Sequence, residues 1–245
     1  MSKSKKFKNA ALLIIGNEIL SGRTQDKNIN YLAKQLFSNG ISLEEVRVIP
    51  DIKSTIIKTV RSLKNNFNYI ISTGGIGATH DDITAESISV ALKRDYCLNK
   101  KAFKELEKYY KNKSDLTDAR KKMAFMPKGS KIILNKVSGA PGFQIENIYV
   151  FAGIPIIAEA MMKEFLKKIK SNTKIYSKSL KTHFYESVIA QRLKDTELMF
   201  NEVRVGSYPI FDGKFRGVEI VMNSYSKKEI ALAFNHLKKE LNKKI

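Results

Sequence analysis

Cysteine, histidine and long apolar runs are scarce in this sequence. The single cysteine, Cys97, excludes a disulfide within the chain, and three histidines spread along the chain make a Cys/His zinc site implausible. No stretch of about 20 apolar residues is present, so we expect no membrane span. The apolar run at residues 10–15 is too short for the core of a secretory signal. We therefore expect a cytoplasmic protein.

Acidic residues are also scarce relative to basic ones. The 44 Lys and Arg against 24 Asp and Glu give a formal net charge of +20. Such a charge is typical of nucleic-acid-binding proteins, but here lysines occur in nearly every polar segment, which favours a general compositional bias. We therefore do not expect nucleic acid as the partner. The positive field should nevertheless attract small anionic substrates.

The most informative stretch is a glycine-rich loop between an apolar strand and a helical pattern. The strand is predicted at residues 69–73, and Gly74, Gly75 and Gly77 follow it. This arrangement aims backbone N–H groups and a helix N-terminus at one point, where an anion can sit. Asp81 and Asp82 come next and would repel a bare phosphate, unless a divalent cation bridges them or one acts as a base. The alternative is a plain tight turn with one aspartate capping the helix.

Two other loops are predicted to lie beside this one. An apolar run without alternation at residues 10–15 indicates a buried parallel strand that ends at Gly16, and a second strand at residues 43–49 ends just before Asp51. The order strand, helix, strand, helix, strand, helix favours a parallel sheet with helices on both faces. In such sheets ligands bind at the carboxyl ends of the strands, so the three loops should meet at one rim.

The rest of the sequence is predicted to continue the first domain and then to form a second one. We expect helical segments within residues 99–124, strands at 131–134 and 148–151, a glycine/proline loop at 138–143 and a helix from 155 to about 170. The composition turns polar at 170–174, which predicts a boundary between a domain at 1–171 and a second one at 172–245. The second domain is predicted to be a small α+β unit with strands at 175–183, 202–211 and 215–222 and helices at 184–194 and 226–243.

Five blocks of residues carry a family resemblance. They are Ile15–Gly22, Asn28, Thr73–Thr84, Ala140–Phe143 and Gly153–Pro155. In this order they resemble the MoaB/Mog molybdopterin-binding family, and within it the N-terminal half of CinA-type proteins. The later small domain is similar to the module that follows in CinA proteins. The amidase domain of full-length CinA proteins is absent, so nicotinamide-nucleotide deamidation is not expected.

The resemblance implies a fold and two activities. The fold is a three-layer α/β/α arrangement with a mostly parallel sheet, in a homo-oligomer. In Mog-type members the carboxylates that match Asp82 and Asp51 bind or adenylylate a pterin phosphate. CinA-type members are instead associated with hydrolysis of ADP-ribose-like or dinucleotide pyrophosphates, which depends on Mg²⁺ or another divalent cation such as Co²⁺.

Candidate roles can be assigned to the residues at the rim. Asp51 and Asp82 are the candidate catalytic residues, and Glu18, Asp81 and Asp82 are the candidate metal ligands. Residues that could contact the nucleotide or pterin phosphate are Gly16, Asn28, Gly74, Gly75, Gly77, Thr79, Thr84, Pro141 and Gly142. Simpler roles stay open for several of them. Asp51 could cap a helix, Glu18 could be a surface carboxylate, Asn28 could be structural, and Pro141–Gly142 could be a turn.

The sequence departs from the family pattern at two positions. Ala78 stands where proline is usual, and Asn17 stands where aspartate is common, which would give a metal site one charge fewer. Three functions therefore remain. They are metal-dependent pyrophosphate hydrolysis, molybdopterin binding or adenylyl transfer, and a non-enzymatic module that binds nucleic acid. The last lacks support because the second domain has no GxxG loop between helices and no aromatic RNA-binding pattern.

Overall fold

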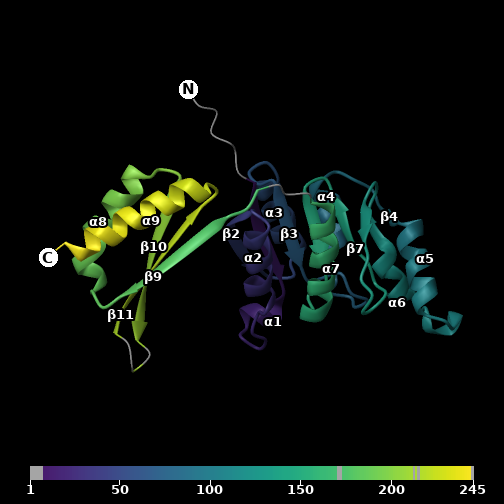
Figure 1. Ribbon diagram of the computed structural model, residues 1–245. Helices are drawn as coiled ribbons and strands as arrows, with labels where there is room; N and C mark the ends of the chain where they lie inside the picture. The colour runs from purple at the N-terminus through teal and green to yellow at the C-terminus, as the bar shows by residue number, and fades with distance from the viewer. Residues whose placement is uncertain (1–7, 170–172, 212, 214–215, 244–245) are drawn as a thin grey trace. The chain divides into compact units, whose positions relative to one another are not determined.

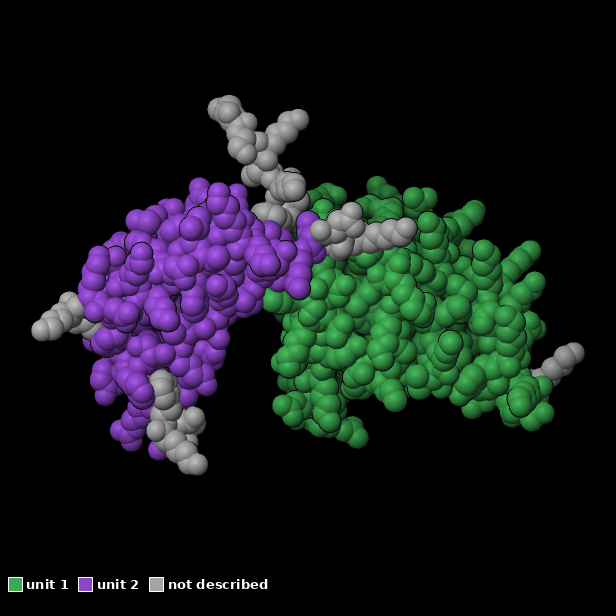
Figure 2. Space-filling model, in the orientation of Figure 1, with its two compact units in different colours: residues 1–170 green, residues 171–245 purple. Residues whose placement is uncertain are grey.

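The computed structural model describes residues 8–169, 173–211, 213 and 216–243 (Figure 1). The chain divides into two compact units, residues 1–170 and 171–245 (Figure 2). Within the described residues, no helix is both long enough and apolar enough to span a membrane.

The first unit is built around a mixed sheet of six strands in the order β2-β1-β3-β8-β7-β6. In this order the strands are Ser42–Ile49, Asn9–Ile15, Tyr69–Thr73, Ile148–Phe151, Gly142–Ile145 and Lys131–Ile133. Strands β2, β1, β3 and β8 are parallel, whereas β7 is antiparallel to both of its neighbours. The mostly parallel sheet confirms the predicted fold class.

Helices cover both faces of this sheet (Figure 1). Helices α3 (Lys53–Lys64) and α4 (Thr84–Ala91) pack on the face that carries Leu13. Helices α2 (Asn28–Ser38) and α7 (Pro155–Lys168) pack on the face that carries Leu12. Successive strand residues point to opposite faces, so the non-alternating apolar run of β1 fills both layers of the core at once.

The helical segments expected within residues 99–124 are present, but the sequence did not predict the strands on either side of them. Strand β4 (Tyr96–Leu98) pairs with β5 (Phe125–Pro127) around this segment. Between these strands lie α5 (Lys100–Tyr109), α6 (Asp118–Lys121), and 3₁₀ turns at Lys113–Asp115 and Lys122–Ala124. The strands have three residues each, too few to show a period in the sequence.

The predicted loop at 138–143 is wrong at its end, because Gly142 and Phe143 begin strand β7. A side chain at Gly142 would lie 2.3 Å from the carbonyl oxygen of Val150 on β8. Glycine is therefore used here for close packing of two strand backbones rather than for a turn.

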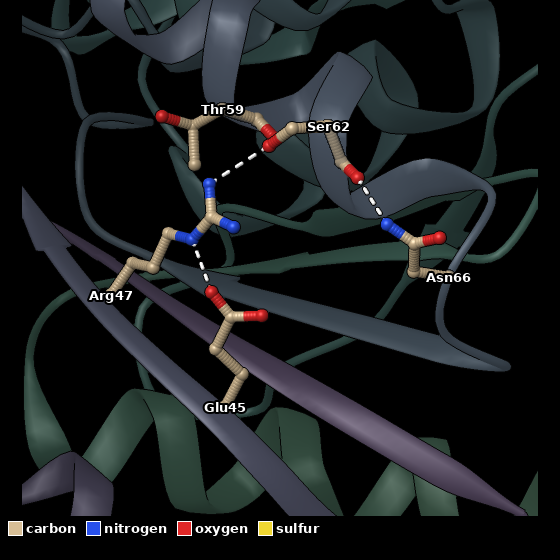
Figure 3. A network of polar contacts seen from close by, with 5 residues as sticks. All are labelled: Glu45, Arg47, Thr59, Ser62 and Asn66. Carbon is tan, nitrogen blue, oxygen red and sulfur yellow. Dashed lines mark hydrogen bonds and ion pairs between the residues drawn. The ribbon is translucent and has the colours of Figure 1, made fainter.

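A polar network fastens the edge strand β2 to α3 (Figure 3). The Arg47 guanidinium pairs with Glu45, two residues away on the same strand face, and donates to the Ser62 hydroxyl at 2.8 Å. Ser62 donates to the Thr59 carbonyl, and Asn66 donates to the Ser62 carbonyl, both at 2.8 Å. The network links β2 to α3, whose first residue comes shortly after Asp51.

The second unit has a separate core. Strands β9 (Tyr176–Thr182), β10 (Val203–Phe211) and β11 (Arg216–Ser224) form an antiparallel sheet in the order β10-β11-β9. Helices α8 (Glu186–Met199) and α9 (Lys227–Asn242) supply the rest of the buried cluster. The predicted small α+β arrangement is confirmed for this unit.

Gly74 is where three strand ends meet. Its N–H donates to the carbonyl of Phe151 on β8 at 3.2 Å, and its φ is +100°. An added Cβ would lie 2.1 Å from the carbonyl oxygen of Ile15 on β1. Neither the backbone conformation nor the space accommodates a side chain.

We predict that Gly74→Ala destabilises the first unit by about 3 kcal/mol or more, or prevents folding, because backbone atoms must move. Gly22→Ala is the matched control: its φ is +71° and nothing lies within 4 Å of an added Cβ. It should cost only the left-handed strain of about 1–2 kcal/mol. Urea unfolding measures both, and equal costs would show that the contact with Ile15 does not matter.

Candidate functional site

The loops after β1, β2 and β3 lie at the same edge of the sheet, because these strands are parallel neighbours. Gly16 follows β1, Asp51 follows β2 and Gly74 follows β3. The Gly16 N–H donates to the Ile49 carbonyl at 3.2 Å, which joins the first two loops. The rim predicted from the sequence is therefore present as an arrangement of backbone.

Asp51 ties two of these loops together. Its Oδ2 accepts a hydrogen bond from the N–H of Asn17, in the short helix α1 (Asn17–Leu20), at 2.8 Å. The alternative role as a cap of α3 is wrong, since Ile52 is the N-cap residue and no side chain caps that helix. The carboxylate therefore faces the β1 corner instead of its own helix.

The surroundings of Asp51 make its charge costly. Burial raises the pKa of the Asp51 carboxyl above its usual range, and the nearby carboxylates of Glu18 and Asp81 raise it further. The hydrogen bond from Asn17 acts in the opposite direction. Carboxylates from the other two loops thus lie within electrostatic reach of Asp51.

Glu18 folds back over the end of β1. A Cβ added to Gly16 would lie 2.6 Å from Glu18 Oε1, so the carboxylate occupies the space that a side chain there would need. Glycine at position 16 therefore leaves room for Glu18 at the rim.

The glycine loop holds Asp82 firmly. Asp82 Oδ2 accepts hydrogen bonds from the Thr79 N–H at 2.8 Å and from the Thr79 hydroxyl. It lies against Gly77, where an added Cβ would be 2.6 Å from the same oxygen. Neither Asp81 nor Asp82 caps α4, whose N-cap residue Ile83 makes no side-chain cap. The alternative of a plain helix cap is therefore wrong.

Asp81 differs from its neighbour because it is exposed. The polar side chain of Thr79 beside it lowers the pKa of Asp81, and charge interactions with His80 and Lys122 lower it further. It therefore stays ionised and available to solvent or to a bound cation.

Buried hydroxyl groups lie under the glycine loop. Thr84 is fully buried, and its Oγ1 has no hydrogen-bond partner in the described part of the chain. This oxygen lies 2.2 Å from the position that a Cβ on Gly75 would take. Thr73 Oγ1, at the end of β3, is buried and unpartnered in the same way. Buried polar atoms without partners are rare, and water, an ion or a ligand usually accounts for them.

The backbone of the loop has free donors as well. The N–H groups of Gly75 and Gly77 make no hydrogen bond within the described residues, whereas the Gly75 carbonyl accepts from the Thr84 N–H at 3.0 Å. Unpaired backbone N–H groups in a glycine loop are donors of the kind that bind oxyanions.

A small pocket adjoins this loop. Its volume is about 10 Å³, enough for about one water molecule, so the greater part of any nucleotide or pterin would lie above the rim. The pocket is lined by Gly75, Ile76, Gly77, Asp82, Ala85, Tyr96, Lys122, Met123, Phe125, Pro141 and Phe143. Pro141 is thus placed beside the predicted anion-binding loop.

Asn28 has a different place. It is buried, and its Nδ2 donates to the Gly153 carbonyl at 2.8 Å, which fastens the start of α2 to the loop before α7. It does not line the pocket, and Gly142 lies within strand β7.

The candidate metal ligands do not form a ready-made cluster. Within the described residues, no three His, Cys, Asp or Glu side chains are grouped so that they could hold a metal ion. Mg²⁺ is usually bound by one or two carboxylates together with substrate phosphates and water. The hard oxygen donors of Asp82, Asp81 and Glu18 fit that mode of binding.

Sequence reasoning missed one wall of the pocket. Tyr96, Lys122 and Phe125 come from the segment between α4 and β6 and reach the glycine loop only through the β4–β5 pairing. The Lys122 ammonium donates to the Thr79 carbonyl at 2.9 Å, across 43 residues of sequence. No pattern in the sequence distinguishes this lysine from the many others.

The fold and the rim define a three-layer α/β protein whose polar loops gather at the carboxyl ends of parallel strands. Residues 11–171 match the family described as "probable molybdopterin binding domain", and the chain belongs to this family. Residues 174–245 match the family described as "FAD synthase, middle domain". The expected MoaB/Mog membership is confirmed.

The relatives agree with this assignment. A protein of Archaeoglobus fulgidus is 33% identical over 198 residues, which cover 81% of this chain and 84% of that protein. A CinA-like protein of Thermosipho melanesiensis is 30% identical over 82% of this chain, and one of Fusobacterium nucleatum is 35% identical over 76%. The match spans about half of these two longer proteins, 52% and 48%.

A solved structure supports the CinA-type resemblance. The crystal structure of the protein CinA from Thermoplasma acidophilum, described as of unknown function, superimposes with a TM-score of 0.62. It is 31% identical, and the match covers 66% of this chain and 97% of that chain.

We predict that Asp51→Asn raises the melting temperature at pH 7 by about 2 °C. Because the pKa of Asp51 is raised on folding, the folded protein binds a proton more readily than the unfolded chain, and the ionised carboxylate destabilises the fold. This destabilisation of the parent by ionised Asp51 should decrease as the pH falls through the raised pKa. It should be absent below pH 3.8, which is the ordinary pKa of an aspartate. Calorimetry at several pH values measures this.

Asp118→Asn is the control of opposite sign. A hydrogen bond and ion pair with Lys121 lower the pKa of Asp118, so neutralising this carboxylate should leave the melting temperature unchanged or lower it. A lower melting temperature for Asp51→Asn at pH 7 would show that the hydrogen bond to Asn17 outweighs the repulsion.

Proposed function

We propose that the first unit binds a phosphorylated small molecule at this rim and hydrolyses the pyrophosphate bond of an ADP-ribose-type or dinucleotide substrate, with Mg²⁺ or a similar divalent cation. The observation that carries the proposal is the convergence at Gly75. Gly75, Gly77 and Asp82 line the same small pocket, and the unpartnered, buried hydroxyl of Thr84 lies against Gly75. The match to CinA-like proteins supports the substrate class, as the resemblance implies it.

Each group has a distinct task in this proposal. The N–H groups of Gly75 and Gly77 hold phosphate oxygens, whereas the buried Thr84 hydroxyl lies beneath Gly75 as part of the loop's support. A divalent cation supplies charge neutralisation when it is bound, and Asp82 and Asp81 are its protein ligands. Positioning of this kind accounts for most of the rate enhancement in phosphoryl transfer.

Asp51 is proposed as the base. Its raised pKa makes the carboxylate a better proton acceptor than an ordinary aspartate. As water attacks, a bond forms between its oxygen and one phosphorus, and the bond from that phosphorus to the bridging oxygen breaks. Asp51 takes the proton of the water and later returns it to solvent. The products are two phosphate monoesters.

The second candidate is molybdopterin binding or adenylyl transfer. The family description of residues 11–171 favours it. A pterin phosphate would use the same N–H groups, so the two candidates differ only in the chemistry after binding. A panel of nucleotide diphosphates and molybdopterin, with and without Mg²⁺, separates them by phosphate-ester release and by thermal shift.

We predict that Asp82→Asn lowers kcat/KM for ADP-ribose hydrolysis with Mg²⁺ about 100-fold or more, because a charged cation ligand is lost. The amide oxygen can still accept from the Thr79 N–H, so the melting temperature should stay within about 3 °C of the parent. Product release measured by chromatography gives the rate.

Asp95→Asn is the matched control. Asp95 is an exposed carboxylate paired with Lys128 at 3.2 Å, and its neutralisation should leave the rate within about twofold. Equal rates for Asp82→Asn and the parent would reject the hydrolytic proposal. Tight molybdopterin binding without hydrolysis of any diphosphate would establish the second candidate.

A further inference from the structure

Carboxylates crowd the rim, and the substrate proposed for it is a polyanion. Glu18 and Asp81 both lie within electrostatic reach of Asp51, and Asp82 lies in the same loop as Asp81. A single divalent cation would leave this group of charges and a diphosphate with excess negative charge. A positive side chain at the glycine loop would offset part of the excess.

Lys122 is placed to do this. It is the one basic residue among those that line the pocket beside Gly75, Gly77 and Asp82. Its ammonium is close enough to Asp81 to lower that carboxyl's pKa. One of its three N–H donors bonds the Thr79 carbonyl at 2.9 Å, so up to two remain for another acceptor.

The neighbouring lysine behaves differently. Lys121 pairs with Asp118 at 2.8 Å on the exposed side of α6. Within the described part of the chain, Lys122 has no such ion pair at salt-bridge distance. An ammonium held at an anion-binding loop, with no ion pair at salt-bridge distance within the described residues, can donate to an anionic ligand.

The segment that carries Lys122 is braced. The Thr117 hydroxyl accepts from the Arg120 N–H and caps α6. The Arg120 guanidinium donates to the Asp115 carbonyl at 2.5 Å and stacks 4.6 Å from the centre of the Tyr110 ring. The aromatic pair Tyr96–Phe125 fixes the strand that comes next. Lys122 is therefore held over the loop before any ligand arrives, which lowers the entropy lost on binding.

We infer that Lys122 is a phosphate ligand of the rim, donating to an oxygen of the bound diphosphate while it retains the Thr79 carbonyl. The inference rests on the proposed function for its substrate class. It also predicts a preference among ligands. The Lys122 ammonium should increase the affinity for a diphosphate but not the affinity for a neutral nucleoside. The competing role is a purely structural clamp on Thr79.

The test compares Lys122→Gln, Lys122→Arg and Lys121→Gln in the full chain. Calorimetry measures the binding of inorganic pyrophosphate and of ADP-ribose with Mg²⁺, and kinetics give KM and kcat separately. Lys122→Gln should weaken pyrophosphate binding and raise KM about 10-fold or more, as expected for loss of a charge-assisted hydrogen bond. Lys122→Arg should restore most of the affinity.

Lys121→Gln removes the same charge one residue away and should change affinity less than about twofold, which separates a direct contact from the general field. Adenosine binding should be equal in all variants, since adenosine carries no phosphate. Pyrophosphate affinity that is unchanged in Lys122→Gln, with only a lower melting temperature, would overturn the inference and establish the clamp.

Failure of the inference and failure of the proposed function give different results. If the parent binds pyrophosphate but hydrolyses nothing, the hydrolytic function fails and the comparison of affinities still decides the role of Lys122. If the parent hydrolyses ADP-ribose and Lys122→Gln is equally active, only the lysine assignment fails. If the parent binds neither inorganic pyrophosphate nor ADP-ribose, both are rejected.

Discussion

The close approach of Gly74 to the carbonyl of Ile15 is the constraint on which the rim depends. It brings the end of β3 against the end of β1 and starts the glycine loop with a backbone angle of φ +100°. The loop can then place Gly75 over the Thr84 hydroxyl and Gly77 over the Asp82 carboxylate. A side chain at either of the last two glycines would occupy the space of a polar group of the candidate site. Strand packing and ligand chemistry are thus set by the same few residues.

The distribution of charge at the rim opposes the charge of the whole molecule. The chain carries a formal charge of +20, yet the loops after the first three strands supply Glu18, Asp51, Asp81 and Asp82. Such a local conflict raises the free energy of the folded state and is common at functional sites. A cation together with an anionic ligand would resolve it. The positive remainder of the surface would favour the approach of that anion from a distance.

The sequence predicted the large features because their signals are strong. The apolar run of β1 and the glycine loop after β3 indicated parallel strands and a common rim, and the five motif blocks indicated the family. The sequence patterns of short strands and single residues did not predict the structure correctly. Strands β4 and β5 have three residues each, Gly142 lies in a strand instead of a turn, and Asp51 bonds Asn17 across the rim instead of capping α3. Lys122 is one of 44 Lys and Arg, and only the tertiary pairing of β4 with β5 brings it to the loop. Local pattern thus specifies elements, whereas contacts between distant segments select the polar groups that meet.

The polar edge of the main sheet has a consequence for how copies of this chain can associate. At one margin β2 carries Glu44, Glu45 and Arg47, and the last two are locked into the network with α3. At the other margin β6 has only three residues. A strand from another copy that paired with β2 would meet charged side chains. A strand that paired with β6 would find too few residues for a stable hydrogen-bonded ladder. Any self-assembly of this unit would therefore proceed through helices or loops, and a sheet continuous across two subunits is disfavoured.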